Sequence, residues 1–198
     1  MKRKCLILAV LAVLMSLTGC KNRNDMKSDP EKNAVMEAIL GRTSIRNYDD
    51  RHVEADKVES LLRAGMAAPS AKNVQPWEFV VVNERPLLDS MADGLPYAKM
   101  LTQASLAIVV CGNSEASALW MQDCSAAAQN ILLAAHSFGL GTVWTAAYPY
   151  EDRISVVSSA LGLPENIVPL CVIPVGYPAK EHTTKDKWDM GKVKYNKW

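Results

Sequence analysis

The feature that most constrains the fold is an uninterrupted apolar run, SLAIVVC, at residues 105–111. A strand that is half-buried alternates apolar and polar residues, whereas a run without alternation is typical of a strand buried on both faces. The chain has 198 residues, 49% of them hydrophobic, which gives room for one domain with a substantial core. We therefore expect a single sheet with an inner strand at 105–111.

Helical and strand patterns alternate along the rest of the chain. We predict helices over 30–41, 55–67, 84–91, 117–138 and 151–161, and strands over 77–82, 105–111, 142–147 and 168–176. The last strand contains Pro169 and Pro174. Because each proline removes one donor from the ladder, parts of that strand should lie at an edge or a bulge.

Such alternation would favour a parallel, doubly wound sheet. The glycine loops that hold phosphates in such folds, GxGxxG and GxxxxGK[ST], are both missing. Gly139-Leu140-Gly141 follows a predicted helix, and the C-terminal end of a helix is the wrong end for a phosphate. The sequence thus argues against a dinucleotide-binding domain with its own cofactor loop.

The first 32 residues differ from the rest. Lys2-Arg3-Lys4 precede an apolar stretch at 5–17, and Leu17-Thr18-Gly19-Cys20 resembles the lipobox of bacterial lipoproteins. We predict a signal peptide at 1–19, a lipid on Cys20, a polar tether at 20–32, a domain at 33–198 and anchoring to a membrane of the cell envelope. A plain transmembrane anchor is the alternative, but the apolar stretch is shorter than the ~20 residues that span a bilayer.

Charge gives no sign of a nucleic-acid partner. Without Lys2, Arg3 and Lys4, 19 basic residues face 21 acidic ones, and no basic stripe remains.

Cysteine and histidine positions give no sign of a metal site. Beyond Cys20 the chain has three cysteines in apolar contexts, which we expect to be core thiols rather than disulfide partners: Cys111, Cys124 and Cys171. There is no CxxC, and His52, His136 and His182 lie far apart. We assign His136 no role beyond the core.

The first candidate site segment is Arg42-Thr43-Ser44-Ile45-Arg46, just past a predicted helix end. In an extended segment the side chains of Arg42, Ser44 and Arg46 can converge on one side. A guanidinium presents a planar fork that matches phosphate oxygens, and a hydroxyl adds a neutral donor. The segment fits a phosphate monoester, although a solvated loop would explain the same residues taken alone.

The second candidate segment is PSAKNVQPW at 69–77, a proline-bounded loop between a predicted helix and a core strand. It offers one hydroxyl and two side-chain amides, from Ser70, Asn73 and Gln75. Amides can match both donor and acceptor edges of a heteroaromatic ring. An ordinary turn, rich in Pro, Ser and Asn, is the alternative.

Together and in this order, followed by WEFVVV at 77–82, the two segments resemble the nitroreductase family of flavin enzymes. The resemblance continues through residues 123–149, LGLPE at 161–165, PVGYP at 174–178 and KVKYNKW at 192–198. It covers essentially all of 33–198. It implies an α+β, nitroreductase-like fold, with a central mixed or antiparallel sheet flanked by helices, in an intertwined homodimer whose C-terminal tail (188–198) wraps the partner.

The resemblance also implies FMN as cofactor and places its contacts on particular residues. The expected contacts at the phosphate and ribityl end are Arg42, Thr43, Ser44 and Arg46. A late basic pair closes this end in the family, and the candidates here are Lys185 and Lys187, where many relatives have arginine. The expected contacts across to the partner's flavin are Pro69, Ser70, Ala71 and Asn73, with Gln75 holding the loop or contacting the ring. The expected backbone donors near flavin N5 are Thr145, Ala146 and Ala147.

The implied reaction is a two-electron, ping-pong reduction of a flat acceptor such as a nitroaromatic or a quinone. The electron chemistry belongs to the flavin, so no side chain is assigned as a catalytic acid or base. The usual donor in the family is NADH or NADPH, which is scarce outside the cytoplasm. A quinol or membrane partner is therefore an alternative donor, and a flavin- or ligand-binding lipoprotein without such turnover is the alternative function. The pocket roof is expected around 93–103 and 113–117.

Overall fold

The computed structural model describes residues 33–198, and Ala34–Trp198 form one compact unit. The predicted signal peptide, Cys20 and the tether at 20–32 lie outside the described residues. Within 33–198 no helix is both long and apolar enough to cross a membrane.

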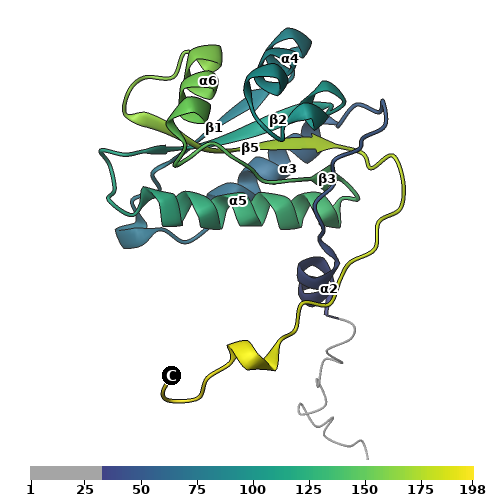
Figure 1. The fold of residues 1–198 in the computed structure, drawn as a ribbon, viewed down its shortest axis with the longest axis vertical. Helices are drawn as coiled ribbons and strands as arrows, with labels where there is room; N and C mark the ends of the chain where they lie inside the picture. Colours follow the sequence, from purple (N-terminus) through teal and green to yellow (C-terminus); the bar gives the residue numbers. More distant parts are fainter. Residues whose placement is uncertain (1–32) are drawn as a thin grey trace, which may run out of the picture. The chain divides into compact units, whose positions relative to one another are not determined.

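The core of the unit is one antiparallel sheet (Figure 1). Its strand order is β1 (Trp77–Val82), β2 (Leu106–Asn113), β5 (Ile167–Gly176) and β3 (Gly141–Thr142), and β4 (Thr145–Ala146) also pairs with β5. Every one of these pairings is antiparallel, and the isolated bridge between Ser44 and Thr142 is parallel. The α+β class is confirmed, and a parallel, doubly wound sheet is excluded.

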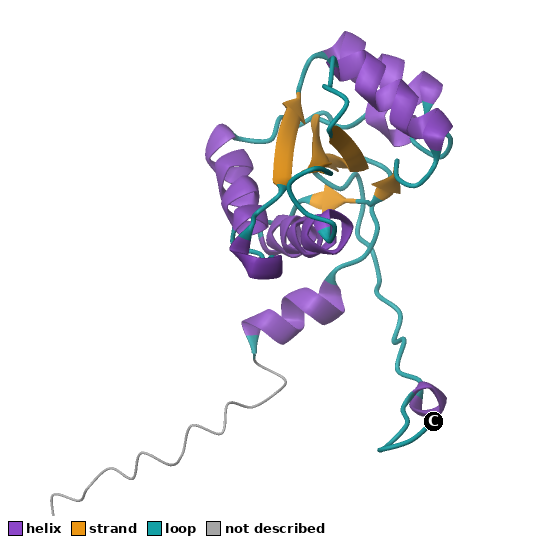
Figure 2. Cartoon of the chain, turned by 90° about the vertical axis from the view of Figure 1, so that its left-hand side faces the viewer, coloured by secondary structure: helices purple, strands orange, loops and turns teal. Residues whose placement is uncertain are grey.

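Helices cover both faces of this sheet (Figure 2). One face carries α3 (Ala55–Met66) and α5 (Trp120–Ser137), and the other carries α4 (Arg85–Gly94) and α6 (Glu151–Leu161). Along β2, Ile108 and Val110 pack in the cluster that contains α3 and α5 side chains, whereas Val109 packs in the cluster that contains those of α4 and α6. The unbroken apolar run therefore forms an inner strand buried on both faces, as predicted.

The prolines of β5 lie at irregular places in the ladder, but the strand is not at an edge. On β2 the neighbours Val110 and Cys111 pair with Cys171 and Pro169 of β5. Leu170, between these two partners, has no partner on β2 and forms a bulge. Pro174 falls opposite the gap between β3 and β4, and its carbonyl lies 3.4 Å from the Tyr48 hydroxyl on that side. The missing Pro174 donor therefore faces a position without a ladder partner. The expectation that the prolines lie at an edge or a bulge is confirmed, by the bulge beside Pro169 and by the missing ladder partner beside Pro174.

Other segments depart from their predicted bounds. The strand expected over 142–147 is split into β3 and β4 by Val143-Trp144, and the long helix begins at Trp120 rather than residue 117. Short 3-10 turns form at Ala71–Asn73, Lys99–Thr102 and Met190–Lys192. The helix α2 (Ala34–Gly41) has no buried residue, and Ile39 and Leu40 of its predicted apolar stripe are 45% and 68% exposed.

The three predicted core thiols are buried and reduced. Burial raises the pKa of Cys111 and that of Cys124 to about 12, and it also raises the pKa of the fully buried Cys171. Since the thiolate is the reactive form, these cysteines are chemically inert in the folded chain.

We expect the free energy of unfolding to fall as pH rises above about 9, the range in which an unfolded thiol ionises. The unfolded chain then loses thiol protons while Cys111 and Cys124 keep theirs until about pH 12, so alkali favours unfolding. Each thiol contributes at most ~1.4 kcal/mol per pH unit. Urea unfolding at pH 8, 9 and 10 measures how steeply the free energy of unfolding falls with pH, and a Cys111→Ala/Cys124→Ala variant should show a smaller slope, since Cys171 alone remains of the three buried thiols. Equal slopes in the two proteins would contradict the assignment.

Candidate functional site

The segment 42–46 is held as an extended edge against β3. Ser44 forms a parallel bridge with Thr142, and the Ile45 amide donates to the Thr142 carbonyl at 2.9 Å. Ile45 is buried, whereas Ser44 and Arg46 are exposed and Arg42 is half-buried. The alternation places Ser44 and Arg46 on the side opposite Ile45, whereas Arg42 directly follows α2, where its amide donates to the Ala38 carbonyl at 3.1 Å.

Two core contacts fix this segment. The buried Tyr48 hydroxyl donates to the Ile45 carbonyl at 2.8 Å, and burial raises the pKa of Tyr48. On β3, a Cβ at Gly141 would come within 2.6 Å of the Ile45 side chain. Only glycine at 141 therefore lets the segment approach the strand this closely without a shift in Ile45.

The two guanidinium groups are available to a ligand. Among residues 33–198, no hydrogen bond or ion pair engages the side chain of Arg42 or Arg46. Arg42 and Thr43 border a cavity of about 600 Å³ whose other walls are Ile39, Leu40 and residues 183–188. Lys185 and Lys187 line this same cavity, so the structure brings both predicted lysines together with Arg42. Ser44 and Arg46 are not among the residues that line it.

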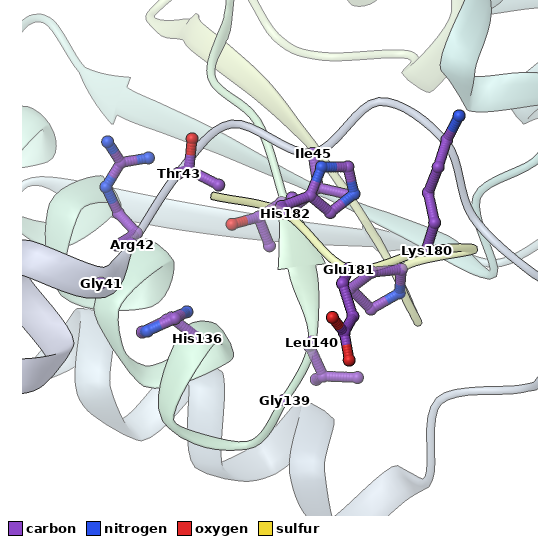
Figure 3. A pocket seen from close by; sticks show the side chains of 12 residues that line it. Gly41, Arg42, Thr43, Ile45, His136, Gly139, Leu140, Lys180, Glu181 and His182 are labelled. Atoms are coloured by element: carbon purple, nitrogen blue, oxygen red, sulfur yellow. The ribbon is translucent and has the colours of Figure 1, made fainter. Parts of the chain in front are cut away.

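A second cavity, of about 330 Å³, shares Arg42 and Thr43 (Figure 3). It is closed by the last turn of α5 with His136, by Leu140 and by the segment after β5 with Glu181 and His182. Sequence analysis assigns none of these residues a site role. The place of His136 on a long apolar helix predicts a core residue, and the segment 178–182 has no pattern that indicates a site. Among residues 33–198, no group of three or more His, Cys, Asp or Glu side chains could hold a metal.

The loop at 69–75 is shaped by its own polar groups. Lys72, Asn73 and Gln75 have positive φ angles of 52°, 57° and 54°, which non-glycine residues seldom adopt. The Ser70 hydroxyl accepts from the Gln75 amide at 3.0 Å, and the Gln75 side chain donates to the Asn73 side chain at 3.0 Å. Gln75 therefore holds the loop. Strained backbone that is held this way is often part of a binding site.

Asp123, in the first turn of α5, fixes this loop to the domain. Its Oδ1 accepts the Ala71 amide at 3.0 Å, and the residue is only 6% exposed. Its Oδ2 is buried without a partner among the described residues. Sequence reasoning missed Asp123, because an aspartate at the start of a helix is an ordinary feature of helix ends.

The donors at 145–147 point in different directions. The Ala147 amide donates to the Leu170 carbonyl at 3.0 Å, so it is directed towards β5. Because hydrogen-bonded pairs alternate along an antiparallel ladder, the Thr145 amide also faces β5 and the Ala146 amide faces outwards. Of the three predicted backbone donors, Ala146 alone is free to meet a ligand at this edge.

Within one chain, the loop at 69–75 and the segment at 42–46 are far apart. The loop is bonded to Asp123 at the start of α5, whereas Arg42 shares a cavity with His136 near the end of that helix. Thirteen residues separate these two helix positions, which corresponds to roughly 20 Å at 1.5 Å per residue. One chain therefore does not bring its two predicted site segments together.

Comparison with known proteins identifies relatives of the whole domain. The profile of the Nitroreductase family matches residues 39–177. A protein of Methanothermobacter thermautotrophicus, provisionally named NADH dehydrogenase/NAD(P)H nitroreductase, is 45% identical over 167 residues, 83% of this chain and 87% of its own length.

Two solved structures show the same fold. A protein of Bacteroides thetaiotaomicron with the same provisional name is 61% identical, with a TM-score of 0.83 over 84% of this chain and 99% of its own. An FMN-dependent nitroreductase of Clostridium difficile is 30% identical, with a TM-score of 0.79 over 82% of this chain and 99% of its own.

Proposed function

Since the chain belongs to the nitroreductase family, we propose that it is an FMN-dependent oxidoreductase that reduces a flat acceptor by two electrons, in a ping-pong cycle with NAD(P)H or another reduced donor. The family membership and the activities for which its relatives are named support the FMN-dependent oxidoreductase class. The proposed acceptor is a nitroaromatic, a quinone or a similar flat ring.

The observation that carries the proposal is that the guanidinium groups of Arg42 and Arg46, four residues apart on a fixed segment, form no hydrogen bond or ion pair among residues 33–198. Arg42 and Arg46 can each offer a fork to a phosphate that carries nearly two negative charges, and Ser44 adds a neutral donor. Lys185 and Lys187 add point charges across the 600 Å³ cavity from Arg42. Because lysine lacks the planar fork, we assign bidentate contact to the arginines.

The remaining groups fit the ring of FMN. The outward Ala146 amide supplies one donor at a sheet edge, which suits N5 of the ring. The loop at 69–75 supplies the Ser70 hydroxyl and the Asn73 amide on a backbone that is already in place before binding. Bound FMN would supply the hydride chemistry, while these residues bind it, orient it and shape the space for donor and acceptor.

The separation of the two site segments along α5 supports a homodimer. If the loop at 69–75 of one chain meets the segment 42–46 of another, each site is complete only in the dimer. The exposed apolar residues Ile39 and Leu40 on α2, and Trp188, Tyr195 and Trp198 in the tail, provide apolar surface for such an interface. We therefore propose an intertwined dimer with two sites, in which the tail wraps the partner.

The predicted signal peptide at 1–19 suggests the cellular location of the enzyme. Leu17-Thr18-Gly19-Cys20 supports a lipid-anchored protein at the cell envelope, where a quinol or a membrane partner would replace NAD(P)H as donor. Wild-type protein should partition with membranes and label with a radioactive fatty acid, while Cys20→Ala should do neither. Equal labelling of the two proteins would remove the anchor.

FMN binding tests the proposed function directly. An Arg42→Ala/Arg46→Ala variant should bind FMN at least about 100-fold more weakly, since a hydrogen bond to a charged group contributes about 1.5–3 kcal/mol. Fluorescence quenching of FMN measures the dissociation constant. The matched control is Arg63→Ala, which removes an exposed arginine of α3 paired with Glu59 and should leave the affinity unchanged. A wild-type protein that takes up no FMN would refute the function.

Turnover separates the enzyme from a binding lipoprotein. Anaerobic mixing with NADPH, NADH or a quinol should bleach the flavin absorbance with at least one donor. Bound FMN that no donor bleaches would favour the alternative of a flavin-binding lipoprotein.

Mixed dimers test the two-chain site. One chain carries Arg42→Ala/Arg46→Ala, and the other carries Ser70→Ala/Asn73→Ala. Each homodimer should bind FMN poorly. Every mixed dimer regains one intact site, so random exchange should restore about one quarter of all sites, because half of the dimers are mixed. If both segments acted within one chain, mixing would restore none, and that result would refute the shared site.

A further inference from the structure

Arg153 lies in the first turn of α6, where its positive charge is not expected to stabilise the fold. It is the third residue of α6, and a positive charge in the first turn of a helix faces the positive end of the helix dipole. Its Nε is buried without a partner, and among residues 33–198 no carboxylate pairs with its side chain. A residue that breaks local rules in this way commonly serves a function.

The contacts of Arg153 lead to the strand edge that carries the free backbone donor. Its NH1 donates to the Ala146 carbonyl at 3.3 Å, and its guanidinium carbon lies 3.8 Å from the centre of the Tyr150 ring. The stacking on Tyr150 fixes the plane of the guanidinium, which keeps the donor aimed at Ala146.

The peptide between Ala146 and Ala147 is thereby held at both ends. Its carbonyl accepts from Arg153, and its amide donates to the Leu170 carbonyl at 3.0 Å. With this peptide fixed, the preceding Ala146 amide can point only outwards from β5. Arg153 therefore sets the direction of the donor that the proposed function assigns to flavin N5.

We propose that Arg153 is a positioning residue of the flavin site, which aims the Ala146 amide and raises the reduction potential of bound FMN. The inference rests on the proposed function. A fixed positive charge beside a flavin favours the reduced cofactor, which is the more electron-rich form. The carboxylates of Glu151 and Asp152 in the same turn oppose this charge, but both side chains are exposed, so solvent screens them more than it screens the half-buried guanidinium.

The test compares Arg153→Gln, which keeps a donor but loses the charge, with Arg153→Lys, which keeps the charge. The matched control is Arg63→Gln on the exposed surface of α3. The midpoint potential of bound FMN is measured by anaerobic titration against a reference dye. In Arg153→Gln the ratio of reduced to oxidised FMN at a fixed redox poise should fall on the order of tenfold, the effect of one charge at about 10 Å in an effective dielectric of about 20. Arg153→Lys should restore most of it.

A second readout separates function from structure. Urea unfolding of the FMN-free protein should give the same midpoint for Arg153→Gln as for the control, because the weaker bond from an uncharged donor to Ala146 and the relieved helix-end charge offset each other. An unchanged potential in Arg153→Gln, or failure of that variant to fold, overturns the proposal and assigns Arg153 to structure. Wild-type protein that binds no FMN overturns the proposed function as well, whereas normal FMN binding with an unchanged potential overturns this inference alone.

Discussion

The length and rigidity of α5 are the constraint on which the site depends. The helix carries the loop at 69–75 near its start, through Asp123, and the cavity with Arg42 near its end, through His136. A helix of 18 residues cannot bring these ends together, so one chain holds the two predicted site segments apart. The proposed homodimer follows from this geometry, because a second copy could place its loop against the segment 42–46 of the first.

The sheet provides the fixed frame for both half-sites. Ile45 packs against Gly141 and is bonded to Thr142, and Tyr48 holds the same segment from beneath. The backbone at 42–46 is thus set by buried contacts, while its charged side chains face away from them. The buried thiols of Cys111 and Cys124 stay protonated, so neither is a ready nucleophile. The chain fits a protein that supplies position and charge and leaves the electron chemistry to a cofactor.

Local pattern was sufficient to predict most of the elements and the segments of the site. The apolar run at 105–111 indicated an inner strand, and helical spacing located α3, α4, α5 and α6, because both signals depend on neighbours within a few residues. The segments 42–46 and 69–77 were identified from residue chemistry and from their resemblance to a family. None of these inferences needed to know which strand lies beside which.

The tertiary structure decided what depends on distant contacts. Pro174 is tolerated inside the sheet only because the break between β3 and β4 lies opposite it, and neither segment reveals this alone. Asp123 and Arg153 gain their roles from Ala71 and Ala146, residues that are distant in sequence or on another element. Sequence by itself determined which residues are chemically able to bind, since that follows from their side chains. Only the fold decided which of their donors remain free, because a hydrogen bond made within the protein cannot also serve a ligand.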